Sequence, residues 1–187
     1  MRLKNSSTAY GLISIGLHWL IAIAVIGMFG LGYWMVDLGY YDSWYHKAPA
    51  LHKSIGLVLF TVLLFRIVWR FTNPPVQPVV SHSPWVRMGA KLGHLLMYVF
   101  LFTIVFSGYL ISTADGVGIP VFGLFEVPAS IQGLPDQADL AGFIHKYVAW
   151  GLMFTVFIHA VAALKHHWLD RDETLVRMFG KGSRKSK

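Results

Sequence analysis

The sequence contains no cysteine, and only 13% of its 187 residues are charged. Without cysteine the chain has no disulfides, no cysteine-bound zinc, no iron–sulfur cluster and no covalent c-type haem attachment. The shortage of charge leaves too few polar side chains to cover a soluble globule, in which about 25% of residues are charged. Apolar residues reach 55% and aromatic residues 15%. This composition disfavours disorder, fibres and an ordinary soluble enzyme.

Long stretches without charge indicate where the chain crosses a membrane. Residues 5–36, 92–114 and 147–164 contain no Lys, Arg, Asp or Glu. Each stretch can cover most or all of a hydrocarbon layer of about 30 Å, which takes about 20 helical residues. The uncharged stretch 54–65 has only twelve residues, a length that would also suit a buried soluble helix. The charge distribution decides whether this stretch crosses.

The cations gather at the N-terminus, in the segment 66–91, and in the tail from Lys165 onward. The positive-inside bias places all three groups in the cytoplasm, which requires an even number of spans between them. Residues 50–71 therefore cross, with Arg66 and Arg70 reaching the inner interface. The inside then holds 13 of the 16 cations and 3 of the 9 acids, a charge of +10, and the outside holds −3. These sum to the net charge of +7. The excess of positive charge is therefore explained by the cytoplasmic segments of a membrane protein and does not indicate a nucleic-acid partner.

These patterns predict an all-α integral membrane four-helix bundle with up-down topology and both termini in the cytoplasm. We expect one transmembrane domain over residues 1–187, with spans at about 10–36, 50–71, 88–113 and 141–167 and a basic cytoplasmic tail at 168–187. The first span is too long for the apolar core of a signal peptide, so we expect it to stay in the mature protein. The stretch 121–127 of the outer loop is expected at the membrane surface.

Four of the nine histidines fall at two matched depths. His18 and His159 each lie about two turns inside the inner end of a span, whereas His52 and His145 open their spans at the outer end. Fourteen residues separate His145 from His159, a rise of about 21 Å, and the helical turn leaves them only about 40° apart. An ionisable side chain within a bilayer is a functional candidate by default. The alternative is a neutral imidazole that hydrogen-bonds to a neighbouring helix.

Two histidines at each of two depths suit haem b better than zinc. Zinc requires three or four ligands at one point, whereas haem b requires two axial imidazoles and small residues nearby. Gly56 lies one turn after His52, and Gly16, Gly142 and Gly151 lie close to the other histidines.

Four motifs in order resemble the bacterial cytochrome b561 family: GLHWLIAI, HKSIGLVLF followed by RIVWR, GYLISTADG, and HAVAALKHHW. The likeness covers nearly the whole chain. It implies a four-helix protein of the bacterial inner membrane that binds two b-type haems, one between His18 and His159 and one between His52 and His145. Members move electrons between the quinone pool and another redox partner, and their best-described activity is oxidation of superoxide at the outer face with reduction of ubiquinone.

Other histidines and cations have candidate roles around these haems. His94 and His166 are candidates for a quinone or proton site at the cytoplasmic side, the alternative being interfacial anchors or propionate contacts. His82 and His167 are expected to be solvated at the interface. Haem propionates require cations or hydroxyls, and the candidates are Lys53, Ser54 and Lys146 outside and Arg66, Arg70 and Arg87 inside. Membrane-interface anchoring is the alternative for each arginine.

Three functions stay open at this point. The first is transmembrane electron transfer, with lipid, quinone and a periplasmic redox protein as partners. The second is a quinone-linked oxidoreductase that oxidises superoxide, against which the outer charge of −3 counts because an anion is steered by a positive field. The third is a haem-free proton or metal transporter that uses intramembrane histidines.

Overall fold

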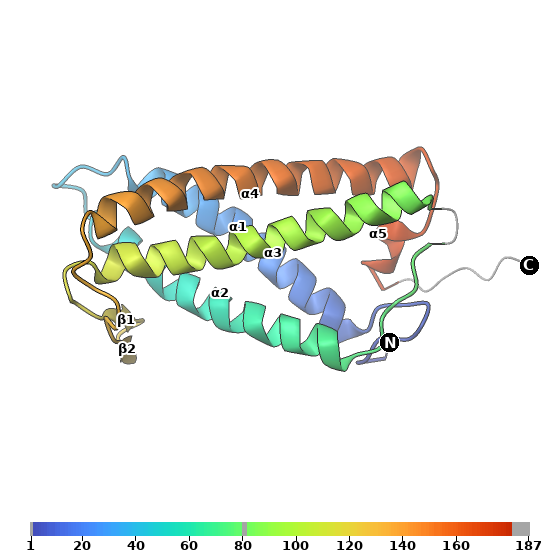
Figure 1. Ribbon diagram of the computed structural model, residues 1–187, viewed down its shortest axis with the longest axis horizontal. Coiled ribbons are helices and arrows are strands. Elements are labelled where there is room, and N and C mark those ends of the chain that lie inside the picture. The colour runs from blue at the N-terminus through green and yellow to red at the C-terminus, as the bar shows by residue number, and fades with distance from the viewer. Residues whose placement is uncertain (1, 80–81, 181–187) are drawn as a thin grey trace, which may run out of the picture. The chain divides into compact units, whose positions relative to one another are not determined.

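The computed structural model describes residues 2–79 and 82–180, and almost all of its regular secondary structure is helical (Figure 1). Four helices are long and apolar enough to span a membrane: α1 (Leu12–Met35), α2 (Lys47–Thr72), α3 (Pro84–Thr113) and α4 (Gln137–Trp168). A short helix, α5 (Thr174–Arg177), follows α4. The expected fold with four membrane-spanning helices is confirmed, and the second span, the weakest in the sequence, is a continuous helix of 26 residues.

Proline positions explain two of the helix ends. Pro84 is the first residue of α3, where a missing N–H costs nothing, and the Ser83 hydroxyl accepts a hydrogen bond from the backbone N–H of Val86 at 3.4 Å. After Thr72, the residues Asn73 and Pro74 stop α2, because a proline disfavours helical geometry in the residue before it.

The chain forms two compact units, and each of the four long helices contributes to both. The first unit consists of Met1–Ala22, Val62–Met97 and Phe154–Lys187. The second unit consists of Ile23–Thr61 and Tyr98–Met153.

In the first unit, Asn5 joins the N-terminal segment to the start of α1 and to the end of α2. Its side-chain oxygen accepts hydrogen bonds from the Gly11 backbone N–H at 2.9 Å and from the Ser14 hydroxyl at 2.7 Å. Its amide nitrogen donates to the carbonyl of Pro74 at 3.2 Å. Trp69 of α2 also donates to the Ser14 hydroxyl, at 3.1 Å. These bonds give the polar groups at this end of the helices internal partners.

In the second unit, the loop between α3 and α4 contains a small antiparallel hairpin of β1 (Ile119–Val121) and β2 (Phe125–Val127) (Figure 1). Phe122 and Gly123 at its turn have φ of 50° and 72°, and the Leu124 N–H donates to the Val121 carbonyl at 3.0 Å. The sequence predicts only a stretch at the membrane surface here.

The buried Ser54 of α2 holds this hairpin. Its hydroxyl donates to the carbonyl of Pro120 at 3.2 Å and accepts from the backbone N–H of Phe122 at 3.1 Å. The hydroxyl proposed for a haem propionate is therefore already bonded within the protein.

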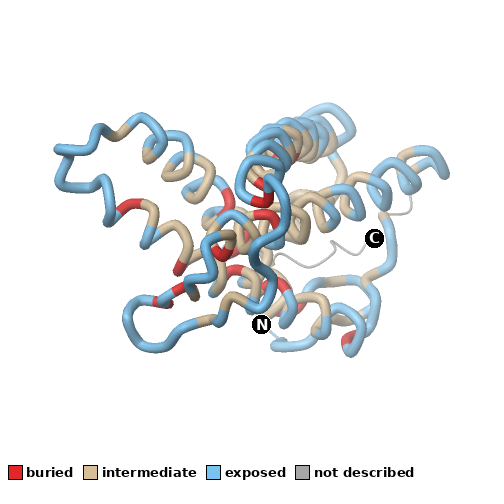
Figure 2. Tube along the Cα trace, turned by 60° about the vertical axis from the view of Figure 1, so that its left-hand side comes forward, coloured by how far each residue is buried: buried red, intermediate tan, exposed pale blue. Residues whose placement is uncertain are grey.

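Buried residues are sparse along all four helices (Figure 2). In the most apolar 18-residue stretch of each helix, at most 11% of the residues are buried. Large side chains such as Ile23, Phe71 and Phe154 are more than 60% exposed. In a membrane protein such faces contact lipid, which is as apolar as they are.

Candidate functional site

In the second unit, His52 of α2 faces His145 of α4. Their ring centroids lie 6.2 Å apart, with the ring planes at 66°. The Nδ1 atom of His52 is buried and, among the described residues, has no hydrogen-bond partner. A buried polar atom without a partner is unusual in a folded protein and points to a missing group.

The other imidazole of this pair is oriented by α3. The Nδ1 atom of His145 lies 2.9 Å from the carbonyl oxygen of Ile104 and 3.2 Å from the Ser107 hydroxyl. Because a carbonyl can only accept, Nδ1 carries the proton, and Nε2 keeps a lone pair for a metal. A histidine that ligates a metal typically donates its second ring N–H in this way.

Two glycines leave room for these imidazoles. A Cβ added at Gly32 of α1 would lie 3.1 Å from Cε1 of His52, and one added at Gly108 of α3 would lie 3.1 Å from Cε1 of His145. Each glycine lies on a helix other than that of the histidine it faces, so spacing around the histidines did not reveal it. By contrast, a Cβ at Gly16 or Gly142 would meet no described atom within 4 Å.

In the first unit, His18 of α1 faces His159 of α4. Their ring centroids are again 6.2 Å apart, with the planes at 58°. One guanidinium nitrogen of Arg66 lies 3.3 Å from Nδ1 of His18, and the other donates to the Leu17 carbonyl at 3.5 Å. The cation proposed for a haem propionate therefore contacts the first histidine of the pair.

The other histidines and cations proposed from the sequence lie in different parts of the structure. The His94 ring lies 5.3 Å from that of His159, whereas His166 belongs to a separate cluster with His82 and Asp172.

Lys53 and Lys146 directly follow the two histidines of the second unit, and Arg70 lies one turn beyond Arg66 on α2. The expectation that His82 is solvated is wrong, because only 14% of its side chain is exposed and its ring bonds to Asp172 at 2.7 Å.

The geometry of both pairs fits two axial imidazoles on one metal. Metal–nitrogen bonds of about 2 Å on opposite sides of an ion place the ring centroids about 6 Å apart. The unpartnered Nδ1 of His52, the donating Nδ1 of His145 and the space beside Gly32 and Gly108 agree with this fit. Four membrane-spanning helices with histidines paired in this way define a membrane cytochrome.

The chain belongs to the prokaryotic cytochrome b561 family, whose model matches residues 9–181. It is 53% identical over 183 residues to "Cytochrome b561 homolog 2" of Escherichia coli (strain K12), a match that covers 98% of this chain and 97% of that protein. It is 30% identical over 179 residues to "Probable superoxide oxidase CybB" of Yersinia pestis, covering 92% and 96%. A third relative, "Cytochrome b561 homolog 1" of E. coli, is 25% identical over 173 residues, covering 88% and 93%. The protein is thus a bacterial membrane cytochrome of the electron-transfer type, and its family implies a b-type haem.

Alanine at Gly32 or at Gly108 should lower the haem content of the purified protein. The added Cβ would lie 3.1 Å from an imidazole carbon, so the ring of His52 or His145 would have to shift by a few tenths of an ångström from its present position. The haem bound per chain, measured by pyridine haemochrome, should fall towards the value of a His52→Ala variant. Gly27→Ala on α1 is the matched control, since its Cβ meets no described atom within 4 Å. Full haem content in both variants would show that this space is not needed.

Proposed function

We propose that this protein carries electrons across the bacterial inner membrane through two b-type haems, one held by His18 and His159 and one by His52 and His145. It exchanges electrons with the quinone pool, ubiquinone being the expected member, at the cytoplasmic side and with a redox partner at the periplasmic side. The observation that supports this most directly is the equal 6.2 Å separation of the two imidazole pairs. Each pair takes one histidine from α4, fourteen residues apart along that helix.

Haem b, when bound, supplies reversible one-electron chemistry, and two imidazole ligands leave the iron no open position for oxygen. The protein itself would hold the haems, orient their histidine ligands and shield them from water. The Ile104 carbonyl keeps the His145 proton on Nδ1, and so keeps Nε2 available as a ligand. Lys53 and Lys146 on one side, and Arg66 and Arg70 on the other, are proposed to bind the haem propionates.

The proposed orientation places both termini in the cytoplasm. It rests on the cations, of which 13 of 16 then lie inside. The pair His18 and His159 is then the inner pair, and His52 and His145 form the outer pair.

An absorption spectrum of the purified protein tests the two-haem proposal. The difference between the dithionite-reduced and the air-oxidised protein should show a sharp α-band, with two haems per chain. His52→Ala and His145→Ala should each lose the outer haem only, which halves the band. Loss of all haem in every variant would contradict the pairing, and a colourless wild-type preparation would favour the transporter function instead.

A quinone site is proposed near the inner pair. A quinone that takes up two electrons also needs two protons and a hydrogen-bond partner. His94 lies beside the inner ligand His159, and His166 lies two turns further along α4 next to Asp170 and Asp172. His94 and His166 are therefore proposed to frame the quinone site, with His94 as the hydrogen-bond partner and proton donor of the quinone.

Replacing either histidine with alanine should slow re-oxidation of the reduced haem by added quinone by about tenfold or more, since a positioned acid contributes at least that much. Stopped-flow absorbance at the α-band measures the rate. The haem spectrum should stay intact, because neither residue is a proposed ligand, and His46→Ala in the loop before α2 serves as control. An unchanged rate in both variants would remove the quinone site from this place.

Superoxide oxidation coupled to quinone reduction is the second candidate function. The observation in its favour is the 30% identity to a protein named as a probable superoxide oxidase. The outer charge of −3 opposes it, unless Lys53 and Lys146 together with Lys47 form a local positive field beside the outer pair.

Charge reversal at these two lysines separates the candidates. If superoxide is the donor, Lys53→Glu and Lys146→Glu should slow reduction of the oxidised haem by superoxide about tenfold at low ionic strength, because the anion loses its attraction. The wild-type protein is the comparison. Equal rates in all variants, or no reduction of the wild type, would leave a periplasmic redox protein as the donor.

A further inference from the structure

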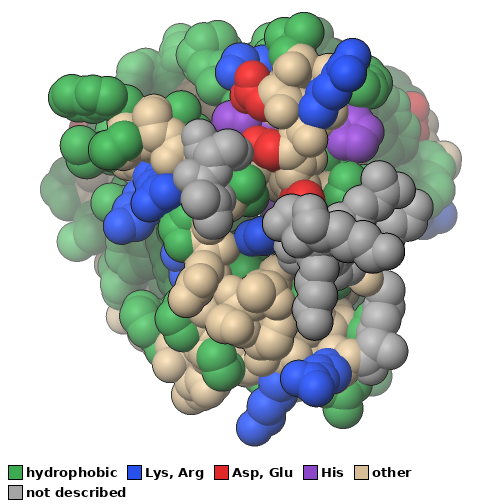
Figure 3. Space-filling view, turned by 90° about the vertical axis from the view of Figure 1, so that its right-hand side faces the viewer, with side chains coloured by type: hydrophobic (Ala, Val, Ile, Leu, Met, Phe, Trp, Pro, Cys, Tyr) green, Lys and Arg blue, Asp and Glu red, His purple; other side chains and the backbone are tan. Residues whose placement is uncertain are grey.

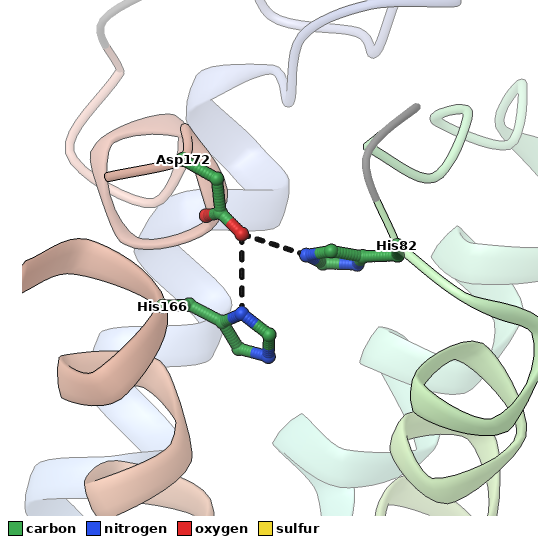
Figure 4. Close-up of side chains that lie close together, drawn as sticks. All are labelled: His82, His166 and Asp172. Carbon is green, nitrogen blue, oxygen red and sulfur yellow. Dashed lines mark hydrogen bonds and ion pairs between the residues drawn. The ribbon is translucent and has the colours of Figure 1, made fainter. Parts of the chain in front are cut away.

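His82, His166 and Asp172 form a cluster that the proposed electron transfer does not use as a unit (Figure 4). His82 comes from the linker before α3, His166 from the last turn of α4, and Asp172 from the turn that follows α4. Their ligand atoms all lie within 4.8 Å of one another. The exposed fraction of the side chain is 14% for each histidine and 5% for the aspartate. The cluster is thus a largely enclosed set of two imidazoles and one carboxylate.

Three side-chain atoms point to a common place. Oδ2 of Asp172 lies 2.7 Å from Nε2 of His82 and 3.1 Å from Nδ1 of His166. In the part of the chain that the structure describes, this Nδ1 makes no hydrogen bond, although Oδ2 of Asp170 also lies 2.8 Å from it. A buried nitrogen this close to two carboxylates, yet outside hydrogen-bond geometry, has the arrangement of a metal ligand among other ligands.

The carboxylate of Asp172 is held for this purpose by the start of α5. Its Oδ1 accepts a hydrogen bond from the backbone N–H of Thr174 at 2.8 Å, which leaves Oδ2 directed at the imidazoles. The backbone N–H of Thr174 therefore sets the orientation of the carboxylate without occupying Oδ2.

The atom types and spacings select the kind of ion. Two imidazoles and one carboxylate are ligands of zinc and of similar divalent transition metals, whereas calcium and magnesium prefer oxygen alone. Around a tetrahedral ion with bonds of about 2.0–2.2 Å, ligand atoms lie about 3.3–3.5 Å apart. The 3.1 Å separation reaches this range with a shift of a few tenths of an ångström, whereas the 2.7 Å separation between His82 and Asp172 must widen by about 0.6 Å or more.

We propose that His82, His166 and Asp172 bind one divalent transition-metal ion of the zinc type, with Asp170 or water in the fourth position. Asp170 is exposed and also pairs with Lys165 at 2.7 Å, so it is the replaceable member. Acidic side chains lie beside histidines on the face that Figure 3 shows. The ion ties the linker before α3, the end of α4 and the segment after it to one point. It is a site separate from both imidazole pairs.

Metal binding is tested on the haem-loaded protein in detergent, so that the proposed haem ligands are occupied. Equilibrium dialysis against buffered Zn²⁺, with the metal counted by mass spectrometry, should give one zinc per chain. Asp172→Asn keeps the shape of the side chain and should weaken binding at least tenfold, as should His82→Ala. His46→Ala removes an exposed histidine outside the cluster and should leave binding unchanged.

X-ray absorption at the zinc edge gives an independent readout, with two imidazole nitrogens expected at about 2.0–2.1 Å. The α-band of each variant shows whether the protein is folded. Zinc binding that survives Asp172→Asn, or a wild type that binds no more zinc than this variant, would overturn the site. The result is independent of the quinone proposal, since zinc binding is measured without electron transfer, and the re-oxidation rate of His94→Ala is measured without zinc.

Discussion

An imidazole within a membrane span must have a partner, and this requirement organises the structure. A polar ring in hydrocarbon is costly, so it is tolerated only where another helix or a bound group satisfies its nitrogens. Here α4 supplies one ring to each pair, and α2 or α1 supplies the other. α3 contributes the Ile104 carbonyl and the space beside Gly108. Each of the four long helices therefore has a residue that is needed around an imidazole.

The spans and the histidine pairs could be derived from the sequence because both depend on position along a helix. Charge-free length determines whether a helix can cross, and depth from the helix end determines which histidines can meet. The weak second span needed the charge balance as well, since its uncharged stretch of twelve residues was ambiguous alone. The length of an uncharged stretch and the distance of a histidine from the helix end depend only on sequence position, so they are the same before and after folding.

Contacts between residues that are far apart in the sequence could not be predicted from sequence position. Gly32 faces His52 from another helix, and nothing in the spacing around either residue indicates it. The hairpin depends on positive φ at Phe122, a conformation that a phenylalanine does not signal, and on Ser54 more than sixty residues earlier. His82 is expected to be solvated at the interface, but its ring contacts Asp172, which lies 90 residues further along the chain.

Six of the nine histidines fall into two groups that differ in their neighbours. Within residues 2–79 and 82–180, the histidines of the two pairs contact no carboxylate, and their rings meet a carbonyl, a hydroxyl, an arginine or another ring. Such surroundings suit neutral imidazoles and a flat, largely apolar cofactor. His82 and His166 instead contact Asp172, outside the apolar stretches. There the desolvation cost of a carboxylate is small, and its charge favours a bound cation. The proposed haem ligands thus have neutral or cationic neighbours and the proposed metal ligands have carboxylate neighbours, so the two proposed sites differ in the chemistry that surrounds the imidazoles.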